Sequence, residues 1–398
     1  MPDALPTPDL EDLRWLVSSA GADVLAAAAE LTGELMTRLK RLRGLVSPER
    51  ARLVLAQTEL RRRGREKFAA ADRMFFTQQG LEQASDEIIA GYKAARFAGQ
   101  EQIFDLCTGI GGDLLSLAAV GITTGFDRDP VSGLFAEANA RALGHQSVSV
   151  RAADVTSIDL AECDAWHIDP DRRPQGRRTT RVELHEPSAE SLTQMLAKNP
   201  QVAIKLAPAA VWPEQWNEQA EWEWISRGRQ CRQLVAWFGS LARQPGRHRA
   251  TAVGAAPSGV ATFVGQPGED VAIASAIDRY VFEPDAAVLA AKLSASLAAQ
   301  HGLHSVLPGI AYWTGPNPID TSLLSCFEVE EVLPFDLKKL KSLLRDRDAG
   351  ALEIKVRGAD QDPTVLRKQL APHGTTPFTL LIARSENRAI AILAKRCP

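Results

Sequence analysis

The sequence predicts an α/β fold in which a parallel sheet with crossover helices lies between a helical N-terminal domain and a small α+β C-terminal domain. Three observations predict it. Apolar residues recur at three- and four-residue steps through residues 9–97, as they do along one face of a helix. From about residue 100, short apolar runs alternate with helical stretches, which is typical of crossover units on a parallel sheet. A shorter alternation of the same kind begins at residue 332.

These changes of pattern predict the domain boundaries. We expect a helical domain over residues 1–97, the sheet domain over 98–265, a connecting segment over 266–331 and a small domain over 332–398. Helix starts are expected at Ser47-Pro48 and around Ser85-Asp86, because serine and aspartate favour the N-cap and proline favours the first helical turn.

The remaining elements follow in chain order. The sheet strands are expected at 102–106, 122–126, 147–150, 165–168 and 202–206, with closing strands or a hairpin at 221–226, 233–238 and 251–264. A helix is expected over 285–299. The C-terminal segment should alternate helix 336–344, strand 352–356, helix 363–370 and strand 378–383.

The composition excludes some classes of protein. The 398 residues carry 46 Lys and Arg against 49 Asp and Glu, so the net charge of −3 excludes a uniformly basic nucleic-acid coat protein. Local basic surfaces remain open, since residues 38–73 hold twelve Lys or Arg against four acids. Five scattered cysteines without a C-x-x-C spacing indicate neither a metal cage nor a disulfide framework. We expect a cytoplasmic protein without metal, secretion signal or membrane segment, of open oligomeric state.

A glycine-rich loop follows the first expected strand. Asp105 ends that strand, and glycines at 109, 111 and 112 allow a tight turn and close approach to a ligand. A dinucleotide fingerprint would require a further glycine at position 114, which is Leu114. The Asp105 carboxylate would repel a pyrophosphate, so the loop favours a cationic ligand.

This loop resembles the first motif of class I S-adenosylmethionine-dependent methyltransferases. Asp127 ends the next strand, 22 residues after Asp105, where the resemblance implies that its carboxylate binds the ribose hydroxyls. Asp154 follows the third strand, where it would accept a hydrogen bond from the adenine amine. The resemblance implies these cofactor-binding residues: Phe76, Thr77, Asp105, Cys107, Gly109, Gly111, Gly112, Asp113, Asp127, Arg128, Asp154 and Val155.

The fourth strand ends in Asp169-Pro170-Asp171-Arg172, at the edge where chemistry occurs in doubly wound sheets. It is similar to the motif of methyltransferases that act on amino groups, in which Asp or Asn precedes two prolines and an aromatic. Here Asp171-Arg172 replaces the second proline and the aromatic. The resemblance implies that Asp169 and Pro170 are catalytic and orient an acceptor amine.

The arginines after this strand allow two interpretations. In the first, Asp171, Arg172, Arg173, Arg177 and Arg178 bind the substrate, with these guanidinium groups and that of Arg181 on phosphates. In the second, Asp169 caps a turn and the arginines pair with acids such as Glu183 and Glu186. Covalent catalysis is not favoured, because Cys163 lies six residues before Asp169.

Together with Phe335 to Gly358, these motifs look like bacterial class I methyltransferases that carry a THUMP-like C-terminal domain. They are more distantly similar to trimethylguanosine synthase-like RNA methyltransferases. The resemblance implies a Rossmann-like sheet, S-adenosyl-L-methionine as cofactor, and RNA as partner, with a base nitrogen of structured RNA (tRNA or rRNA) as acceptor. Two alternatives stay open: a small-molecule methyltransferase, and a non-catalytic RNA-binding protein on a methyltransferase fold.

Overall fold

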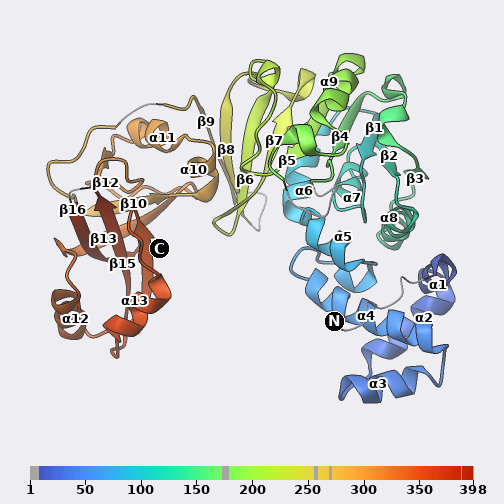
Figure 1. Cartoon of the computed structure of the whole chain (residues 1–398), viewed down its shortest axis with the longest axis horizontal. Coiled ribbons are helices and arrows are strands. Elements are labelled where there is room, and N and C mark those ends of the chain that lie inside the picture. Colours follow the sequence, from blue (N-terminus) through green and yellow to red (C-terminus); the bar gives the residue numbers. More distant parts are fainter. Residues whose placement is uncertain (1–8, 173–178, 255–258, 269–270, 387, 398) are drawn as a thin grey trace. The chain divides into compact units, whose positions relative to one another are not determined.

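A computed structural model of the chain describes residues 9–172, 179–254, 259–268, 271–386 and 388–397 (Figure 1). They fall into two compact units. The first comprises Met1–Ala220 with Val235–Pro245, and the second comprises Glu221–Leu234 with Gly246–Pro398. The residues expected to form a separate helical domain therefore pack in one unit with the first sheet. The finer division into four domains remains a prediction.

The N-terminal part of the first unit is helical, as the periodicity predicts. Its helices are α1 (Leu10–Leu16), α2 (Ser19–Ala29), α3 (Leu35–Leu42), α4 (Pro48–Gly64), α5 (Gln78–Gln83) and α6 (Glu87–Ala94). The Ser47 hydroxyl accepts a hydrogen bond from the Arg50 amide at the start of α4. Asp86 caps α6 by accepting from the Ile89 amide.

The sheet of the first unit is parallel, and its strands follow the predicted ranges closely. They are β1 (Gln102–Leu106), β2 (Ile122–Asp127), β3 (Val148–Ala152), β4 (Ala165–Ile168) and β5 (Val202–Leu206), in the order β3-β2-β1-β4-β5. The crossover helices are α7 (Leu114–Leu117), α8 (Pro130–Ala142) and α9 (Ala189–Lys198). Because β1 lies between β2 and β4, the strand order reverses at β1, and the loops after these three strands meet at one edge.

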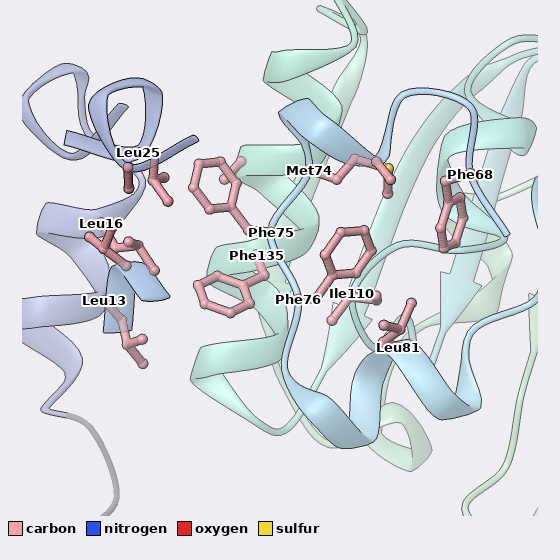
Figure 2. Packing of buried hydrophobic residues seen from close by; sticks show 14 of the residues in the cluster. Leu13, Leu16, Leu25, Phe68, Met74, Phe75, Phe76, Leu81, Ile110 and Phe135 are labelled. Atoms are coloured by element: carbon pink, nitrogen blue, oxygen red, sulfur yellow. The ribbon is translucent and has the colours of Figure 1, made fainter. Parts of the chain in front are cut away.

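One hydrophobic core joins the N-terminal helices to this sheet (Figure 2). Phe75 packs against Phe135 of α8 with ring centroids 6.0 Å apart, and Phe76 packs against Phe68 at 5.9 Å. The buried Asn139 side chain bonds both polar backbone groups of Phe75, and its Nδ2 also donates to the Ile110 carbonyl at 2.9 Å. The helical segment is therefore tied to the glycine-rich loop.

The second unit holds the closing strands β6 (Glu221–Arg227), β8 (His248–Val253) and β9 (Val260–Gly265); β7 (Gln230–Trp237) is divided between the units. Its seven-stranded sheet has the order β11-β12-β10-β13-β16-β15-β14. The strands are β10 (Tyr280–Pro284), β11 (His304–Ser305), β12 (Trp313–Gly315), β13 (Leu324–Pro334), β14 (Ala349–Arg357), β15 (Thr376–Ser385) and β16 (Arg388–Arg396).

The helices of the second unit are α10 (Ala286–Ala290), α11 (Ser294–Gln300), α12 (Leu337–Asp346) and α13 (Pro363–Leu370). The single helix expected over 285–299 is thus two helices, separated where Lys292 adopts a left-handed φ of 58°. Residues 266–331, expected as a connecting segment, contribute β10 to β12 and most of β13 to the seven-stranded sheet. They are therefore part of the fold of the second unit. Within the described ranges, no helix is long and apolar enough to cross a bilayer.

Candidate functional site

A cavity of about 710 Å³ lies at the edge where β1, β2 and β4 end. Most predicted site residues line it. They are Thr77, Asp105, Cys107, Gly109, Gly112, Asp113, Asp127, Arg128, Asp154, Val155, Asp169, Pro170, Asp171 and Arg172. Residues far apart in the sequence therefore share one cavity, large enough for a cofactor and part of an acceptor.

Two predicted cofactor contacts do not line this cavity. Phe76 is 1% exposed and its side chain belongs to the hydrophobic core. The adjacent residue, Thr77, faces the cavity instead. Gly111 turns the loop with a φ of 92° and faces Ala136 of α8. The predicted substrate contacts Arg173, Arg177 and Arg178 lie outside the described residues.

The loop after β1 is held by the acids at the strand ends. Thr108 donates through its hydroxyl to the Asp105 carboxylate at 2.9 Å, and Gly109 donates its amide to Asp127 at 2.7 Å. Burial raises the pKa of Asp127 above its ordinary value. The half-buried Cys107 thiol lies beside these acids, and partial desolvation together with their negative charges raises its pKa, which favours the protonated thiol.

Asp154 lies at the exposed rim of the cavity. Its carboxylate accepts from the Thr156 amide at 2.9 Å and from the Thr156 hydroxyl at 2.8 Å. Both hydrogen bonds lower the pKa of Asp154, so this acid is ionised at neutral pH.

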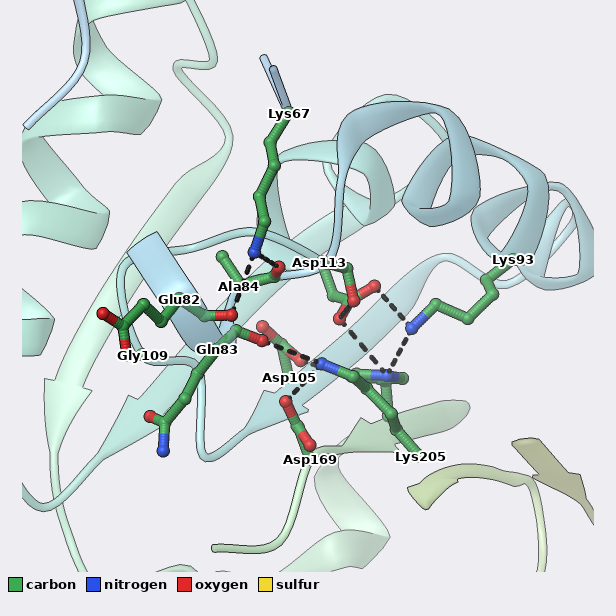
Figure 3. Close-up of polar contacts among 12 residues, drawn as sticks. Lys67, Glu82, Gln83, Ala84, Lys93, Asp105, Gly109, Asp113, Asp169 and Lys205 are labelled. Atoms are coloured by element: carbon green, nitrogen blue, oxygen red, sulfur yellow. Dashed lines mark hydrogen bonds and ion pairs between the residues drawn. The ribbon is translucent and has the colours of Figure 1, made fainter. Parts of the chain in front are cut away.

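A chain of buried polar groups runs beneath the loop (Figure 3). His167 Nδ1 lies 2.7 Å from Asp105 Oδ1, and His167 Nε2 lies 3.3 Å from Lys93 Nζ. Lys93 in turn forms an ion pair of 2.6 Å with Asp113, which also accepts from the Ser85 hydroxyl at 2.8 Å. Burial lowers the pKa of Lys93. Burial would raise the pKa of Asp113, but the charges of Lys93 and His167 outweigh it and hold that pKa well below its usual range.

A second ion pair, between a buried lysine and a half-buried aspartate, lies at the end of β4. Lys205 Nζ of β5 is 2.5 Å from Asp169 Oδ2, and the two side chains are only 7% and 24% exposed. Burial would lower the pKa of Lys205, but the adjacent Asp169 carboxylate outweighs it and raises the pKa. The Lys205 ammonium group therefore lies directly against the Asp169 carboxylate at the cavity wall.

One of the arginines after β4 is close to a predicted acid: Arg181 lies 4.0 Å from Glu183. Glu186 forms its ion pair with Arg128, which follows β2 and was predicted as a cofactor contact. The backbones of Asp171 and Glu186 form an isolated antiparallel β-bridge. The second interpretation of the loop therefore describes Arg181, whereas Arg172 lines the cavity.

Sequence reasoning missed Lys93, His167 and Lys205. A signal for two of them was present. His167 interrupts the apolar strand Ala165–Ile168 and Lys205 interrupts Val202–Leu206, and every residue of both strands is buried. Because a buried polar side chain in a central strand needs a partner, such residues indicate a site or an internal ion pair. No group of His, Cys, Asp or Glu in the described part of the chain is arranged to hold a metal.

Comparison with known proteins identifies the family. The chain is 30% identical over 354 residues to an uncharacterised S-adenosylmethionine-dependent methyltransferase of Mycobacterium tuberculosis, in each of two strains, CDC 1551 and H37Rv. The match covers 84% of this chain and 93% of the relative. The chain belongs to the S-adenosylmethionine-dependent methyltransferases. S-adenosylmethionine is accordingly the cofactor of this methyltransferase, as the resemblance of the glycine-rich loop implies.

Three further findings describe the methyltransferase's architecture. A family described as THUMP domain-like matches residues 324–396, and a domain of unknown function matches residues 9–64. A crystal structure of a methyltransferase candidate from Porphyromonas gingivalis W83 has a TM-score of 0.77 at 18% identity, covering 98% of this chain and 99% of that one. The Rossmann-like fold and the THUMP-like segment are thereby confirmed.

Proposed function

We propose that the methyltransferase transfers the methyl group of S-adenosylmethionine to a base nitrogen of structured RNA. The observation that carries this proposal is the Asp169-Pro170 pair, which ends β4 in the same cavity as the glycine-rich loop. An ionised carboxylate here can accept a hydrogen bond from an acceptor N–H and so direct the nitrogen lone pair toward the methyl group. Catalysis then consists mainly of proximity and alignment, since the sulfonium supplies a reactive methyl.

We assign the cofactor contacts from the same geometry. Asp127 would bind the ribose hydroxyls, because each carboxylate oxygen has acceptor capacity beyond its backbone hydrogen bond. Asp154 would accept from the adenine amine at the rim. Asp105 is 1% exposed and already bonded to Thr108 and His167, so it would act through its charge on the sulfonium and by holding the loop.

Basic surfaces support RNA as the acceptor. Several arginines of residues 38–73 are neutralised by acids, including Arg62 by Glu59 and Arg65 by Asp72. The exposed Lys40, Arg41 and Arg43 at the end of α3 have no acidic partner within 4.0 Å among the described residues. Such unneutralised cations suit a phosphate backbone. The THUMP-like segment adds support by resemblance, because THUMP domains bind RNA.

The substrate proposal is tested by methyl transfer to total RNA. Protein incubated with tritium-labelled S-adenosylmethionine and total bacterial RNA should place label in the RNA, and nuclease treatment before the reaction should abolish it. Mass spectrometry of the nucleosides would then identify the methylated base. Label in small molecules that survives nuclease treatment would instead support a small-molecule acceptor.

The ribose assignment is tested by calorimetry with S-adenosylhomocysteine. Asp127→Ala should weaken binding by about 10- to 100-fold, the usual value of a hydrogen bond to a charged group. Burial raises the pKa of Asp127, so the wild-type affinity should fall with acidification as the pH passes through a value above about 3.9. Asp127→Asn is the control, and its weaker affinity should not change in that pH range. Unchanged affinity in Asp127→Ala would refute the assignment.

A further inference from the structure

The segment before α6 covers part of the cavity and packs on the glycine-rich loop. We call residues 77–85 the strap, since Thr77, Gly80, Gln83, Ala84 and Ser85 all line the cavity. There is no spare room between strap and loop: a Cβ on Gly112 would lie 3.2 Å from the Ser85 amide nitrogen, and one on Gly80 would clash with the Ile110 side chain at 2.5 Å. The position of the strap therefore sets the shape of the cofactor cavity.

Two lysines hold the carbonyl groups of this strap (Figure 3). Lys67 Nζ donates to the carbonyl oxygens of Leu81, Glu82 and Ala84 at 2.7, 3.0 and 2.8 Å. Lys205 Nζ donates to the remaining carbonyl, that of Gln83, at 3.4 Å. Four consecutive carbonyls thus face cations, which stabilises the C-terminal end of α5.

Only one of these lysines also reaches the end of β4. Lys205 lies 2.5 Å from Asp169 Oδ2, whereas Lys67 contacts the strap from beyond the end of α4. Lys205 is 6% exposed and does not line the cavity, so it would not touch cofactor or acceptor. The Lys205 ammonium group therefore contacts both the strap, which forms part of the cavity wall, and the Asp169 carboxylate, which would face the acceptor.

We propose that Lys205 is a positioning residue. It fixes the Asp169 carboxylate relative to the strap, so that the acceptor amine and the cofactor methyl group are aligned. This inference rests on the proposed function, because it assumes that Asp169 receives the acceptor. An ammonium on Oδ2 restricts rotation of the carboxylate and leaves Oδ1 for the acceptor N–H.

Lys67 provides the matched comparison. Lys67→Met loosens the strap without removing a group from Asp169, while Lys205→Met does both. If Lys205 only supports the strap, the two variants should behave alike. If it positions Asp169, Lys205→Met should lower kcat for methyl transfer to total bacterial RNA by about 10- to 100-fold, the effect of a misplaced reacting group. The affinity of Lys205→Met for S-adenosylhomocysteine should then change less than that of Lys67→Met, because Lys205 holds one strap carbonyl and Lys67 holds three. Lys205→Arg, which retains the positive charge, should recover part of kcat.

A second measurement needs no acceptor. In protein labelled with ¹³C at the aspartate carboxyl carbons, the Asp169 resonance is assigned by its absence in Asp169→Asn. Loss of the adjacent ammonium group should change the carboxyl chemical shift of Asp169 at neutral pH in Lys205→Met and leave it in place in Lys67→Met. An unchanged Asp169 chemical shift in Lys205→Met, or equal kcat losses in the two methionine variants, would overturn the positioning role. If RNA receives no methyl group from the wild type but the Asp169 resonance moves as expected in Lys205→Met, the RNA proposal fails and the Lys205–Asp169 coupling stands.

Discussion

Replacing Asp169 by alanine is expected to lower methyl transfer to RNA by at least about 100-fold, because the acceptor amine loses the group that orients it. The affinity for S-adenosylhomocysteine should stay within about threefold of the wild type, less than the loss of one charge-assisted hydrogen bond would cause. The reason is geometric: Asp169 lies at the end of β4, whereas the glycine-rich loop is held by Asp105 and Asp127 from β1 and β2. Tritium transfer and calorimetry on the same preparation would measure both quantities.

The single variant leaves Lys205 without its carboxylate partner, and a buried unpaired charge can destabilise the fold. The double variant Asp169→Ala/Lys205→Met removes both charges and serves as the control. It should regain thermal stability relative to Asp169→Ala but remain inactive. If activity returned together with stability, Asp169 would be a structural residue and not part of the acceptor site. Strongly weakened cofactor binding in both variants would place Asp169 on the cofactor side.

The second large effect is expected at the ion pair of Lys93 and Asp113, whose side chains are 2% and 9% exposed. Asp113→Ala should destabilise the protein by about 3–5 kcal/mol, since removing one partner of a buried pair leaves the other charge unpaired. Urea unfolding followed by circular dichroism at neutral pH would measure the change. The charge-free double variant Lys93→Met/Asp113→Ala should be more stable than Asp113→Ala. If Asp113→Ala were as stable as the wild type, Lys93 would be uncharged in the folded protein and the ion pair would not contribute to stability.

The same pair predicts how stability depends on pH. The pKa of Asp113 is depressed in the folded protein by Lys93 and His167, whose charges outweigh the effect of burial. Its contribution is therefore present at pH values above about 3.9, the pKa of an unfolded aspartate, and is lost as the pH falls toward the folded-state pKa. Asp113→Ala should accordingly show a weaker loss of stability on acidification below about pH 4 than the wild type.

Much of the fold could be predicted because its signals are local. The runs Gln102–Leu106, Ala165–Ile168 and Val202–Leu206 coincide with β1, β4 and β5, since short runs of mostly apolar residues are typical of strands buried on both faces. Strand β16 (Arg388–Arg396) was not predicted, and it joins the sheet by antiparallel pairing with β13 and β15. That pairing depends on strands distant in the sequence, which no local pattern specifies.

For the same reason, only part of the candidate site could be predicted from the sequence. Acids at strand ends could be identified because the carboxyl ends of parallel strands share one edge, and Asp105, Asp127 and Asp169 all line the cavity. Phe76 and Thr77 are adjacent in sequence, and nothing local decides which of the two faces the cavity and which faces the core.

By itself, the sequence determined the strand and helix pattern, the acid-bearing loop that favours a cationic cofactor, and the resemblance to methyltransferases. Only the tertiary structure decided that the N-terminal helices share a core with the sheet and that Lys205 of β5 joins Asp169 to the strap. The physical reason is that spacing along the chain specifies local conformation, while the partner of a buried charge is set by packing between elements. A lysine in an apolar strand shows that a partner must exist; which acid supplies it is known only once β4 and β5 lie side by side.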